Sequence, residues 1–425
     1  MAAAVRLHRS GPMKFAPAPR AVRAGDYVFT SSIYPIDESG HAVTVDQLLG
    51  ETAPSPIEVQ TRHCLEQLEA VLAEHGGRLD RVLKAEVHLV DAADFYEFKL
   101  VWREFFRDDP PARTTIEVGD TFPLRGVRLN LDAVALAGDS RLQRQVLRDP
   151  ELADPLEAEA AALAVRAGNL VFCSGFTASD FKSGITVGRK PGFPNYGNDA
   201  VAQAEHVFSS LNRALAQAGT SLEQALECYL YEPDLKTFYD VDTTGLRYMP
   251  LPPCRASMGV KGLLVPNACF VASLTVLVPD HQHVKAESRA GITYHPVTSR
   301  KVNYSPTLVA GPWLYIAGKT AGDMQTVHGS PAGLPCHFSD IEVQTRWIME
   351  FLTRQITANG SDWDHCHQVR VWLTRPQRDY RGFVRVWREY FPDPARAPAL
   401  AYVPATATMY PGPLIEIDPT CVLRG

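Results

Sequence analysis

The spacing of apolar residues changes in a fixed order along the first third of the chain. A short β-rich run at residues 26–31 is followed, at residues 55–74, by apolar positions at mostly helical spacing. Residues 82–89 then alternate as in a half-buried strand, and aromatic residues three and four apart at 95–106 predict a second helix. With a closing strand at 127–137, the pattern predicts an α+β unit of order β-β-α-β-α-β, with two helices on one face of a mixed sheet.

This unit occurs three times. The hexapeptide at residues 57–62 recurs letter for letter at 341–346, and a tryptophan-containing block at 101–106 has its counterpart at 386–391. A Gly-led run that opens each unit is found at 25–32, 168–175 and 311–318. Counterparts of the predicted helices and strands lie at 199–218, 225–231, 268–278, 339–358, 366–373 and 414–423. We therefore divide the chain into units at residues 1–140, 155–280 and 295–425.

Three such units in one chain predict a particular assembly. A sheet covered by helices on one face must bury its other face, and three such faces can close around a common axis. We expect an intramolecular pseudo-trimer with a central β-barrel-like core, helices outside and a cleft between each pair of units. Clefts at domain junctions are favoured ligand sites. A chain that already holds three units has little need to associate further, so we expect a monomer or at most a dimer.

Composition and charge exclude several classes of partner. Hydrophobic residues make up 45% and charged residues 21% of the 425-residue chain, as in ordinary globular proteins. A net charge of -6 gives no basic field for nucleic acid or an anionic membrane. The longest apolar run, residues 268–278, is too short to span a bilayer, and residues 1–10 lack the apolar core of a signal peptide. A cytoplasmic protein is therefore expected.

Cysteine and histidine spacing predicts neither disulfides nor a metal site. The eight cysteines include no Cys-x-x-Cys pair, which favours reduced, buried thiols. His365 and His367 would share one face of a strand, but no third ligand is spaced nearby. Cys254 has no histidine spaced to activate it as a nucleophile, so a packing role is expected.

The repeated motifs resemble those of the RidA/YjgF family of enamine/imine deaminases. The shared motifs are the Gly-x-hydrophobic-Ser-Gly strand, the Gln-bearing first helix, the Pro-Ala-Arg turn and the closing strand, in that order. The resemblance implies active sites at the interfaces between units and no cofactor. It also implies an Arg of the Pro-Ala-Arg turn that binds the substrate carboxylate, because a guanidinium fork matches that planar anion. A Glu on the last strand would position or activate water, a Tyr near the start would line the pocket, and the Ser-Gly pair would contact the substrate.

Carried over residue by residue, the family pattern is most complete in the third unit. Arg396 is there the predicted carboxylate ligand, Glu416 the predicted base and Tyr304 the pocket tyrosine, while Ala317 and Gly318 replace the Ser-Gly pair. The substrate contacts implied in the other two units are Arg113, Ser31, Asn130, Arg255, Ser174 and Gly175. In the first unit Asn130 stands where the family has Glu, and the last strand of the second unit is apolar at that position. The resemblance thus implies one complete site.

The resemblance implies hydrolysis of the C=N bond of a small enamine or imine carboxylic acid, which releases ammonia and a 2-oxo acid. Arg396 would bind the carboxylate, and Glu416 would orient or deprotonate the water that attacks the imine carbon. An apolar wall would come from the second helix of a neighbouring unit. The sequence leaves two choices open for this wall, which are Phe95 with Lys99 or Phe238 with Asp242.

Two other functions remain open. Fusion and divergence free the units from symmetry, so the protein is alternatively a pathway-specific enzyme that condenses, cyclises or cleaves one carboxylate-bearing intermediate. Glycine- and proline-containing loops at 182–198 and 322–335 would then be candidate lids. A second alternative is a non-catalytic module that binds acidic metabolites. Turnover separates the three, because a generic deaminase hydrolyses many imines, a pathway enzyme ignores them and a binding module converts nothing.

Overall fold

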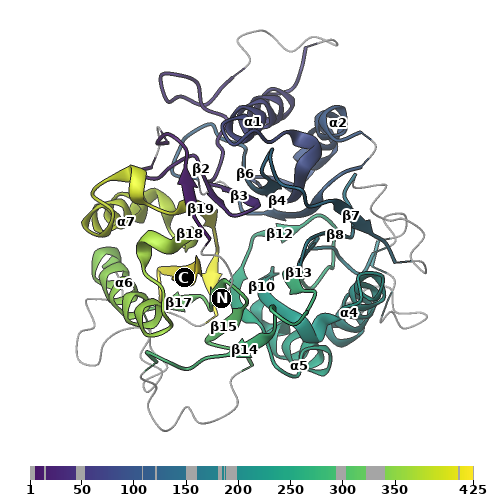
Figure 1. Cartoon of the computed structure of the whole chain (residues 1–425). Helices are drawn as coiled ribbons and strands as arrows, with labels where there is room; N and C mark the ends of the chain where they lie inside the picture. The colour runs from purple at the N-terminus through teal and green to yellow at the C-terminus, as the bar shows by residue number, and fades with distance from the viewer. Residues whose placement is uncertain are drawn as a thin grey trace.

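The computed structural model describes residues 5–13, 16–44, 53–107, 109–119, 122–149, 160–179, 184–185, 187, 199–292, 303–321, 340–409 and 412–424. Within these ranges, three sheet-and-helix units surround a common centre, with the helix pairs outside and both chain ends near the middle of the view (Figure 1). The candidate lid at 322–335 lies outside the described residues, as does nearly all of the one at 182–198.

The first unit contains one sheet and two helices. Its elements are β1 (Leu7–Arg9), β2 (Ala21–Ala24), β3 (Tyr27–Thr30), α1 (Pro56–Ala73), β4 (Val82–Leu89), α2 (Phe95–Phe105), β5 (Ala112–Glu117) and β6 (Leu129–Leu136). The strand order is β1-β2-β3-β6-β4-β5. Only the β4–β5 pair is parallel; the other pairs are antiparallel, so the sheet is mixed.

The second and third units repeat this plan. The second consists of β7 (Arg144–Leu147), β8 (Ala164–Ala167), β9 (Leu170–Cys173), α4 (Ala200–Ala216), β10 (Ala225–Glu232), α5 (Phe238–Tyr248), β11 (Cys254–Gly259), β12 (Gly262–Leu263) and β13 (Val271–Leu277). The third consists of β14 (Lys285–Glu287), β15 (Thr307–Ala310), β16 (Trp313–Ile316), β17 (Lys319–Thr320), α6 (Ile341–Ala358), β18 (Cys366–Leu373), α7 (Pro376–Tyr390), β19 (Ala399–Pro404), β20 (Ala407–Thr408) and β21 (Ile415–Val422).

The structure confirms the α+β class and the three tandem units, and it corrects two details. The predicted order lacks the parallel strand β5 and its counterparts β11 and β19, which begin at or just after the Pro-Ala-Arg motif. The strands also do not close into a barrel. Three separate sheets meet instead, and within the described residues two short strands join neighbours, since β12 pairs with β5 and β20 with β11.

The repeated hexapeptide has a structural explanation. Gln60, Gln203 and Gln344 are buried on the first helix of their units, and each side-chain oxygen accepts a backbone N–H just before the closing strand, at 2.8–2.9 Å. Four side chains tie the first helix to the second at the surface, in the pairs Arg62–Glu104 and Arg346–Glu389. A buried side-chain amide must form hydrogen bonds. Each of these glutamines therefore fixes the start of the closing strand relative to the first helix of its unit.

The centre of the molecule holds ionisable side chains that differ between units. A small cavity there is lined by residues of all three sheets, including Lys84, Glu86, Asp132, Glu227, Tyr229, Gln368 and Arg370. By strand register, Lys84, Glu227 and Gln368 are equivalent, as are Glu86, Tyr229 and Arg370. Arg370 of the third unit binds Asp132 of the first through two hydrogen bonds of 2.6 and 3.0 Å. The core is therefore stabilised by unlike charges supplied by different units.

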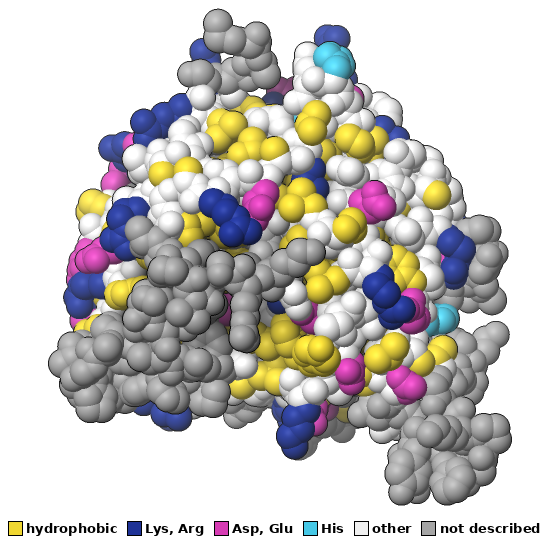
Figure 2. All heavy atoms as spheres, turned by 90° about the horizontal axis from the view of Figure 1, so that it is seen from below, with side chains coloured by type: hydrophobic (Ala, Val, Ile, Leu, Met, Phe, Trp, Pro, Cys, Tyr) yellow, Lys and Arg dark blue, Asp and Glu magenta, His cyan; other side chains and the backbone are white. Residues whose placement is uncertain are grey.

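The described surface carries charges of both signs, and the cysteines and histidines singled out in the sequence lie mostly inside the protein. On the face shown in Figure 2, Lys and Arg side chains lie among Asp and Glu side chains and scattered apolar ones. No helix in the described part of the chain has the length and apolar character needed to cross a membrane. The seven cysteines that the structure describes are buried and free. His365 bonds to Asp362, and His367 lies buried against the rings of Phe29 and Trp313.

Candidate active site

Strand register defines which residues of the three units are equivalent. In the parallel strand pairs, Arg113 lies opposite Ala85, Arg255 opposite Cys228, and Leu400 opposite Val369. On the other side of the same central strands, three residues further on, lie Asn130, Val271 and Glu416. The third unit therefore carries Leu400, not an arginine, at the position of Arg113 and Arg255.

This register corrects the alignment of Arg396 with the other two arginines. Arg396 ends a 3₁₀ turn at Pro394–Arg396 before β19 begins, and its side chain is 67% exposed. There it forms an ion pair with Asp364, which is also exposed. The structure does not bring Arg396 and Glu416 together. The triplet that matches Pro-Ala-Arg in space is Pro398-Ala399-Leu400.

The cleft between the first and second units contains Arg113, which is completely buried. Its Nε donates to Thr115 Oγ1 at 3.0 Å, and its guanidinium carbon lies 5.2–5.5 Å from the ring centres of Phe95, Phe98 and Trp102. Across the interface, Ser174 Oγ accepts the backbone N–H of Arg113, and Gly175 N donates to Thr114 Oγ1. These contacts join the two units, and they leave Arg113 no access to solvent.

The cleft between the third and first units lacks the arginine. The Ser31 hydroxyl accepts a hydrogen bond from the N–H of Leu400 at 2.7 Å and donates one to Pro19 O. Its donor and an acceptor position are thus both used within the protein. Asn130 donates to Tyr402 O at 2.9 Å, and its side-chain oxygen lies 2.7 Å from Nδ1 of the buried His88. The predicted substrate contacts Ser31 and Asn130 thus hold the interface together.

The cleft between the second and third units brings an arginine and a glutamate together. Gly318 N donates to Arg255 O at 3.1 Å, which sets the end of β16 against the start of β11. A Cβ atom at Gly318 would collide with Oε1 at the end of the Glu416 side chain and would lie 3.0 Å from the Cβ atom of Ala256, so a larger residue here would require these neighbours to shift. Tyr304 is partly buried against the apolar cluster that includes Ala317, and its neighbour Ser305 donates its N–H to Pro253 O. This interface therefore brings Arg255 of the second unit close to Gly318 and Glu416 of the third.

Burial shifts the protonation equilibrium of Glu416 at this interface. Burial raises the pKa of Glu416 to about 8, and the positive charges of Lys319 and Arg255 oppose that rise. Lys319 is itself buried, and its ammonium lies 4.5 Å from the ring centre of Phe351. A carboxyl group with a pKa near neutrality can both accept and release a proton.

Arg255 is held by its own unit but keeps donors free. Its Nη1 forms an ion pair with Asp242, whose other oxygen accepts a hydrogen bond from the Asn303 side chain, and its guanidinium carbon lies 4.9 Å from the Phe238 ring centre. Of the two wall choices left open by the sequence, the pair Phe238 and Asp242 lies at this arginine. Nε and Nη2 of Arg255 donate to no atom among the described residues. That edge of the guanidinium can bind a carboxylate in bidentate fashion.

A second carboxyl group near this arginine was not singled out from the sequence. Burial raises the pKa of Glu232, at the end of β10, to about 8, and the Thr237 hydroxyl and Arg255 oppose the rise. Thr237 Oγ1 donates to Glu232 Oε1 at 3.0 Å. Lys319 and Asn303 were missed as well. Arg113 and Arg255 each lie 16 residues before the first residue of their closing strand, whereas Arg396 lies 19 residues before Ile415. This difference would have marked Arg396 as the exception among the three arginines.

Comparisons with known proteins agree with the repeated architecture. The sequence profile of the family called endoribonuclease L-PSP matches residues 12–137, 155–270 and 298–423. The chain is 30% identical over 135 residues to a RutC family protein of Pyrococcus abyssi, covering 32% of this chain and 98% of that protein. It is 34% identical over 113 residues to the 3-aminoacrylate deaminase RutC of Acinetobacter baylyi, covering 27% of this chain and 82% of that enzyme.

A similar solved structure is a YjgF-family protein from Neisseria meningitidis, with 24% identity, a TM-score of 0.25, and coverage of 32% of this chain and 98% of that one. The three stretches that match the family profile take in most of the chain, and each contains the helices and central strands of one unit. The protein therefore belongs to the endoribonuclease L-PSP family, which includes the RidA and YjgF proteins, and it is a fusion of three tandem units of that family.

Proposed function

We propose that the protein hydrolyses small enamine and imine carboxylic acids to 2-oxo acids and ammonia, in the cleft between the second and third units. One observation carries the proposal: among the three interfaces, this one combines an arginine with free donors and a buried glutamate, Arg255 and Glu416. Arg113, at the interface of the first and second units, is fully buried. The interface of the third and first units has Leu400 at the position of the arginine.

Binding begins with the substrate carboxylate. Asp242 and Phe238 hold the guanidinium of Arg255 in place, so its Nε and Nη2 edge is oriented before the substrate arrives. A bidentate pair with the carboxylate fixes the rotation of the substrate as well as its position. The imine carbon, which is bonded to the carboxylate carbon, is thereby held close to the guanidinium, on the side of Glu416.

The chemical step is addition of water to the C=N bond. Glu416 in its ionised form accepts a proton from water as the oxygen bonds to the imine carbon, and the electron pair of the C=N bond moves to nitrogen, which takes up a proton from solvent. Glu416 returns its proton to the nitrogen of the resulting carbinolamine, which leaves as ammonia while the C–O double bond forms and the hydroxyl proton passes to solvent. An enamine substrate first takes a proton on its terminal carbon, which converts it to the imine. The sum is imine plus water giving 2-oxo acid plus ammonia.

The comparisons support this choice over RNA cleavage, which the family description suggests. One relative is a 3-aminoacrylate deaminase, whose named substrate is a small enamine acid. Binding of RNA needs a positive surface. The net charge here is -6, and charges of both signs are mixed on the face shown in Figure 2.

The pH dependence of catalysis tests the role of Glu416. As a base with a pKa of about 8, Glu416 is ionised in only a small fraction of molecules at pH 6. We expect kcat/KM to rise about tenfold per pH unit below pH 8 and to level off above it. The measurement is ammonia and 2-oxo acid release from imines made in situ by an amino acid oxidase, corrected for hydrolysis in buffer. Glu416→Gln should lower kcat/KM by about 10²–10⁴-fold and remove the pH-dependent limb.

Glu232 provides the matched control, because burial raises its pKa to about 8 as well and it lies near the same arginine. In Glu232→Gln, kcat/KM should still rise with pH below pH 8. If this rise is lost in Glu232→Gln and retained in Glu416→Gln, Glu232 is the base instead of Glu416. If wild type leaves all imines at the buffer rate, generic deamination is wrong, and a specialised substrate or a binding role takes its place.

We also propose that the protein is a monomer in the cytoplasm. The three units already occupy the positions of a trimer, and the described cysteines are free and buried, as suits a reducing compartment. Light scattering should give a mass near 46.8 kDa. A stable trimer of chains would contradict the proposed assembly.

A further inference from the structure

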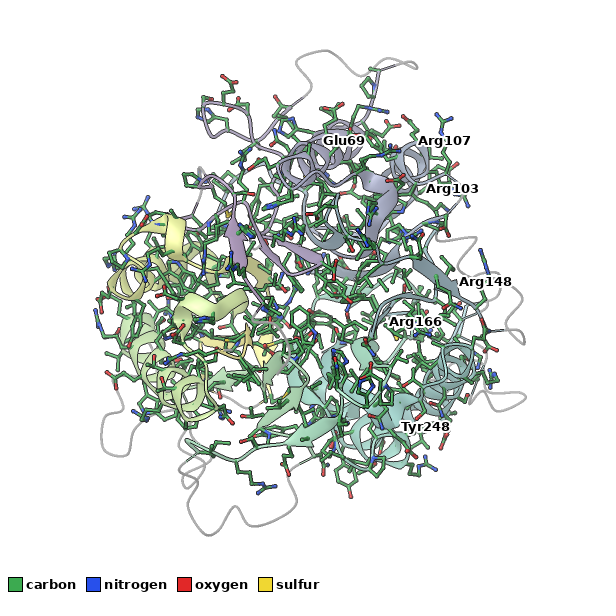
Figure 3. All side chains as sticks on the ribbon, viewed as in Figure 1. Glu69, Arg103, Arg107, Arg148, Arg166 and Tyr248 are labelled. Carbon is green, nitrogen blue, oxygen red and sulfur yellow. The ribbon has the colours of Figure 1, made fainter. Side chains whose placement is uncertain are left out.

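One position in each unit lies against the second helix of a neighbouring unit. Pro17, Ala160 and Asn303 hold this position, spaced 143 residues apart in the sequence. The second helices are α2, α5 and α7, and Figure 3 labels Arg103 on α2 and Tyr248 at the end of α5. The three interfaces can therefore be compared at one equivalent contact.

At two interfaces this position is used through its main chain. The indole N–H of Trp102 on α2 donates to Ala160 O at 2.9 Å. The indole N–H of Trp387 on α7 donates in the same way to Pro17 O at 3.0 Å. Proline and alanine have no side chain that can form a hydrogen bond. These two contacts therefore join neighbouring units without a polar side chain at the shared position.

The interface between the second and third units is joined differently. Gly245 stands on α5 at the place of Trp102 on α2, so it offers no indole to the next unit. The side-chain amide of Asn303 donates instead to Oδ2 of Asp242 on α5. The other oxygen of Asp242 forms the ion pair with Arg255 Nη1. A side chain of the third unit is thus linked, through one carboxylate, to the arginine of the second.

This link limits Asp242 to one contact with Arg255. Asp242 is buried, and a buried carboxylate needs hydrogen bonds to both of its oxygens. With Asn303 on Oδ2, only Oδ1 binds the guanidinium, and its Nε and Nη2 are left for the substrate carboxylate. Without the amide, Asp242 would turn to bind Arg255 through both oxygens, because a bidentate pair is favoured between these groups. It would then occupy a donor that the substrate needs.

We propose that Asn303 is a positioning residue, which holds Asp242 in a single contact with Arg255 and so keeps the guanidinium open to the substrate carboxylate. The inference rests on the proposed function, because it takes Arg255 as the carboxylate ligand. Asn303 belongs to the third unit and Arg255 to the second. The carboxylate site is therefore complete only when these two units are in contact.

Removal of the amide should weaken substrate binding and leave the chemical step unchanged. In Asn303→Ala, KM for imine acids should rise about tenfold, since a hydrogen bond to a charged group is lost and a competing carboxylate is released. The value of kcat and the pH dependence set by Glu416 should stay as in wild type. Ser305→Ala is the matched control, because Ser305 Oγ donates across the same interface to Pro252 O at 2.6 Å and not to Asp242. It should change KM by less than twofold.

A background without the carboxylate tests the cause. Asp242→Asn removes the group that would close on Arg255, so adding Asn303→Ala to it should change KM by less than twofold. A full tenfold loss in that background would overturn the inference. A wild-type KM in Asn303→Ala alone would overturn it as well.

The crystal structure of the Asn303→Ala variant separates this inference from the proposed function. If both oxygens of Asp242 bind Arg255 in that variant, Asn303 has the assigned role, whether or not imines are hydrolysed. If Asp242 keeps its single contact with Arg255, the assignment is overturned. Hydrolysis of imines by wild type would then still support the proposed function.

Discussion

Replacing Arg255 with alanine is expected to lower kcat/KM for imine acids by about 10²–10³-fold, because the substrate loses its bidentate carboxylate ligand. Replacing Arg396 in the same way should change kcat/KM by less than twofold, since that side chain is exposed and pairs with Asp364 at the surface. Arg113→Ala should chiefly lower the melting temperature, because Arg113 is fully buried under three aromatic rings. The measurement is the same ammonia-release assay.

Two further variants separate binding from folding at this site. Arg255→Lys keeps the charge near Asp242 but loses the fork, so it should fold and still lose most of the activity. Asp242→Asn keeps the arginine and tests whether the ion pair orients it. If Arg396→Ala proved to be the inactive variant while Arg255→Ala kept full activity, the site would lie elsewhere and the proposed cleft would be wrong.

Replacing Arg370 with methionine is expected to reduce the free energy of unfolding by about 3–5 kcal/mol. Arg370 and Asp132 are both buried and form a bidentate pair between the third and first units. Burial alone would lower the pKa of Arg370, but Asp132 and neighbouring tyrosines outweigh it, so the guanidinium stays charged. Without it, Asp132 is left buried and unpaired. Loss of this size is a large fraction of the stability of a typical domain, and urea denaturation would measure it.

A double variant tests the cause. The double variant Asp132→Asn with Arg370→Met removes both charges and should recover much of the loss. Equal losses in the single and double variants would contradict the ion-pair explanation.

The sequence predicted most of the fold because each long element carries its own periodicity. The helical spacing at residues 55–74 and the alternation at 82–89 gave the bounds of α1 and β4 almost residue for residue. The expectation of a half-buried strand was wrong, because β4 is buried on both faces between its own helices and the neighbouring units. The parallel strand β5 was not predicted because it is short and buried. Such a run shows no periodic alternation of apolar and polar residues that would distinguish a strand from a turn. Its identity depends on pairing with β4, which is a tertiary property.

The candidate site was harder to predict, for two physical reasons. The shared Pro-Ala-Arg motif aligned Arg396 with Arg113 and Arg255, but strand pairing puts Leu400 at that position. A single sequence does not show which residue pairs with the neighbouring strand. The sequence analysis also paired Glu416 with Arg396 of its own unit. In the structure Arg255 faces the Glu416 of the following unit, because β16 of that unit ends against β11.

The unlike charges at the centre tie each unit to its two particular neighbours in the chain. A single unit released from the chain could reassemble only with copies of itself, and three copies of the middle unit would place three Glu227 carboxylates around one axis. Three copies of the first would gather three Asp132 carboxylates with no Arg370 to neutralise them. Like charges in a dry centre repel strongly. Because Arg370, Asp132 and Glu227 come from different units, each unit fits its two specific neighbours better than it would fit copies of itself.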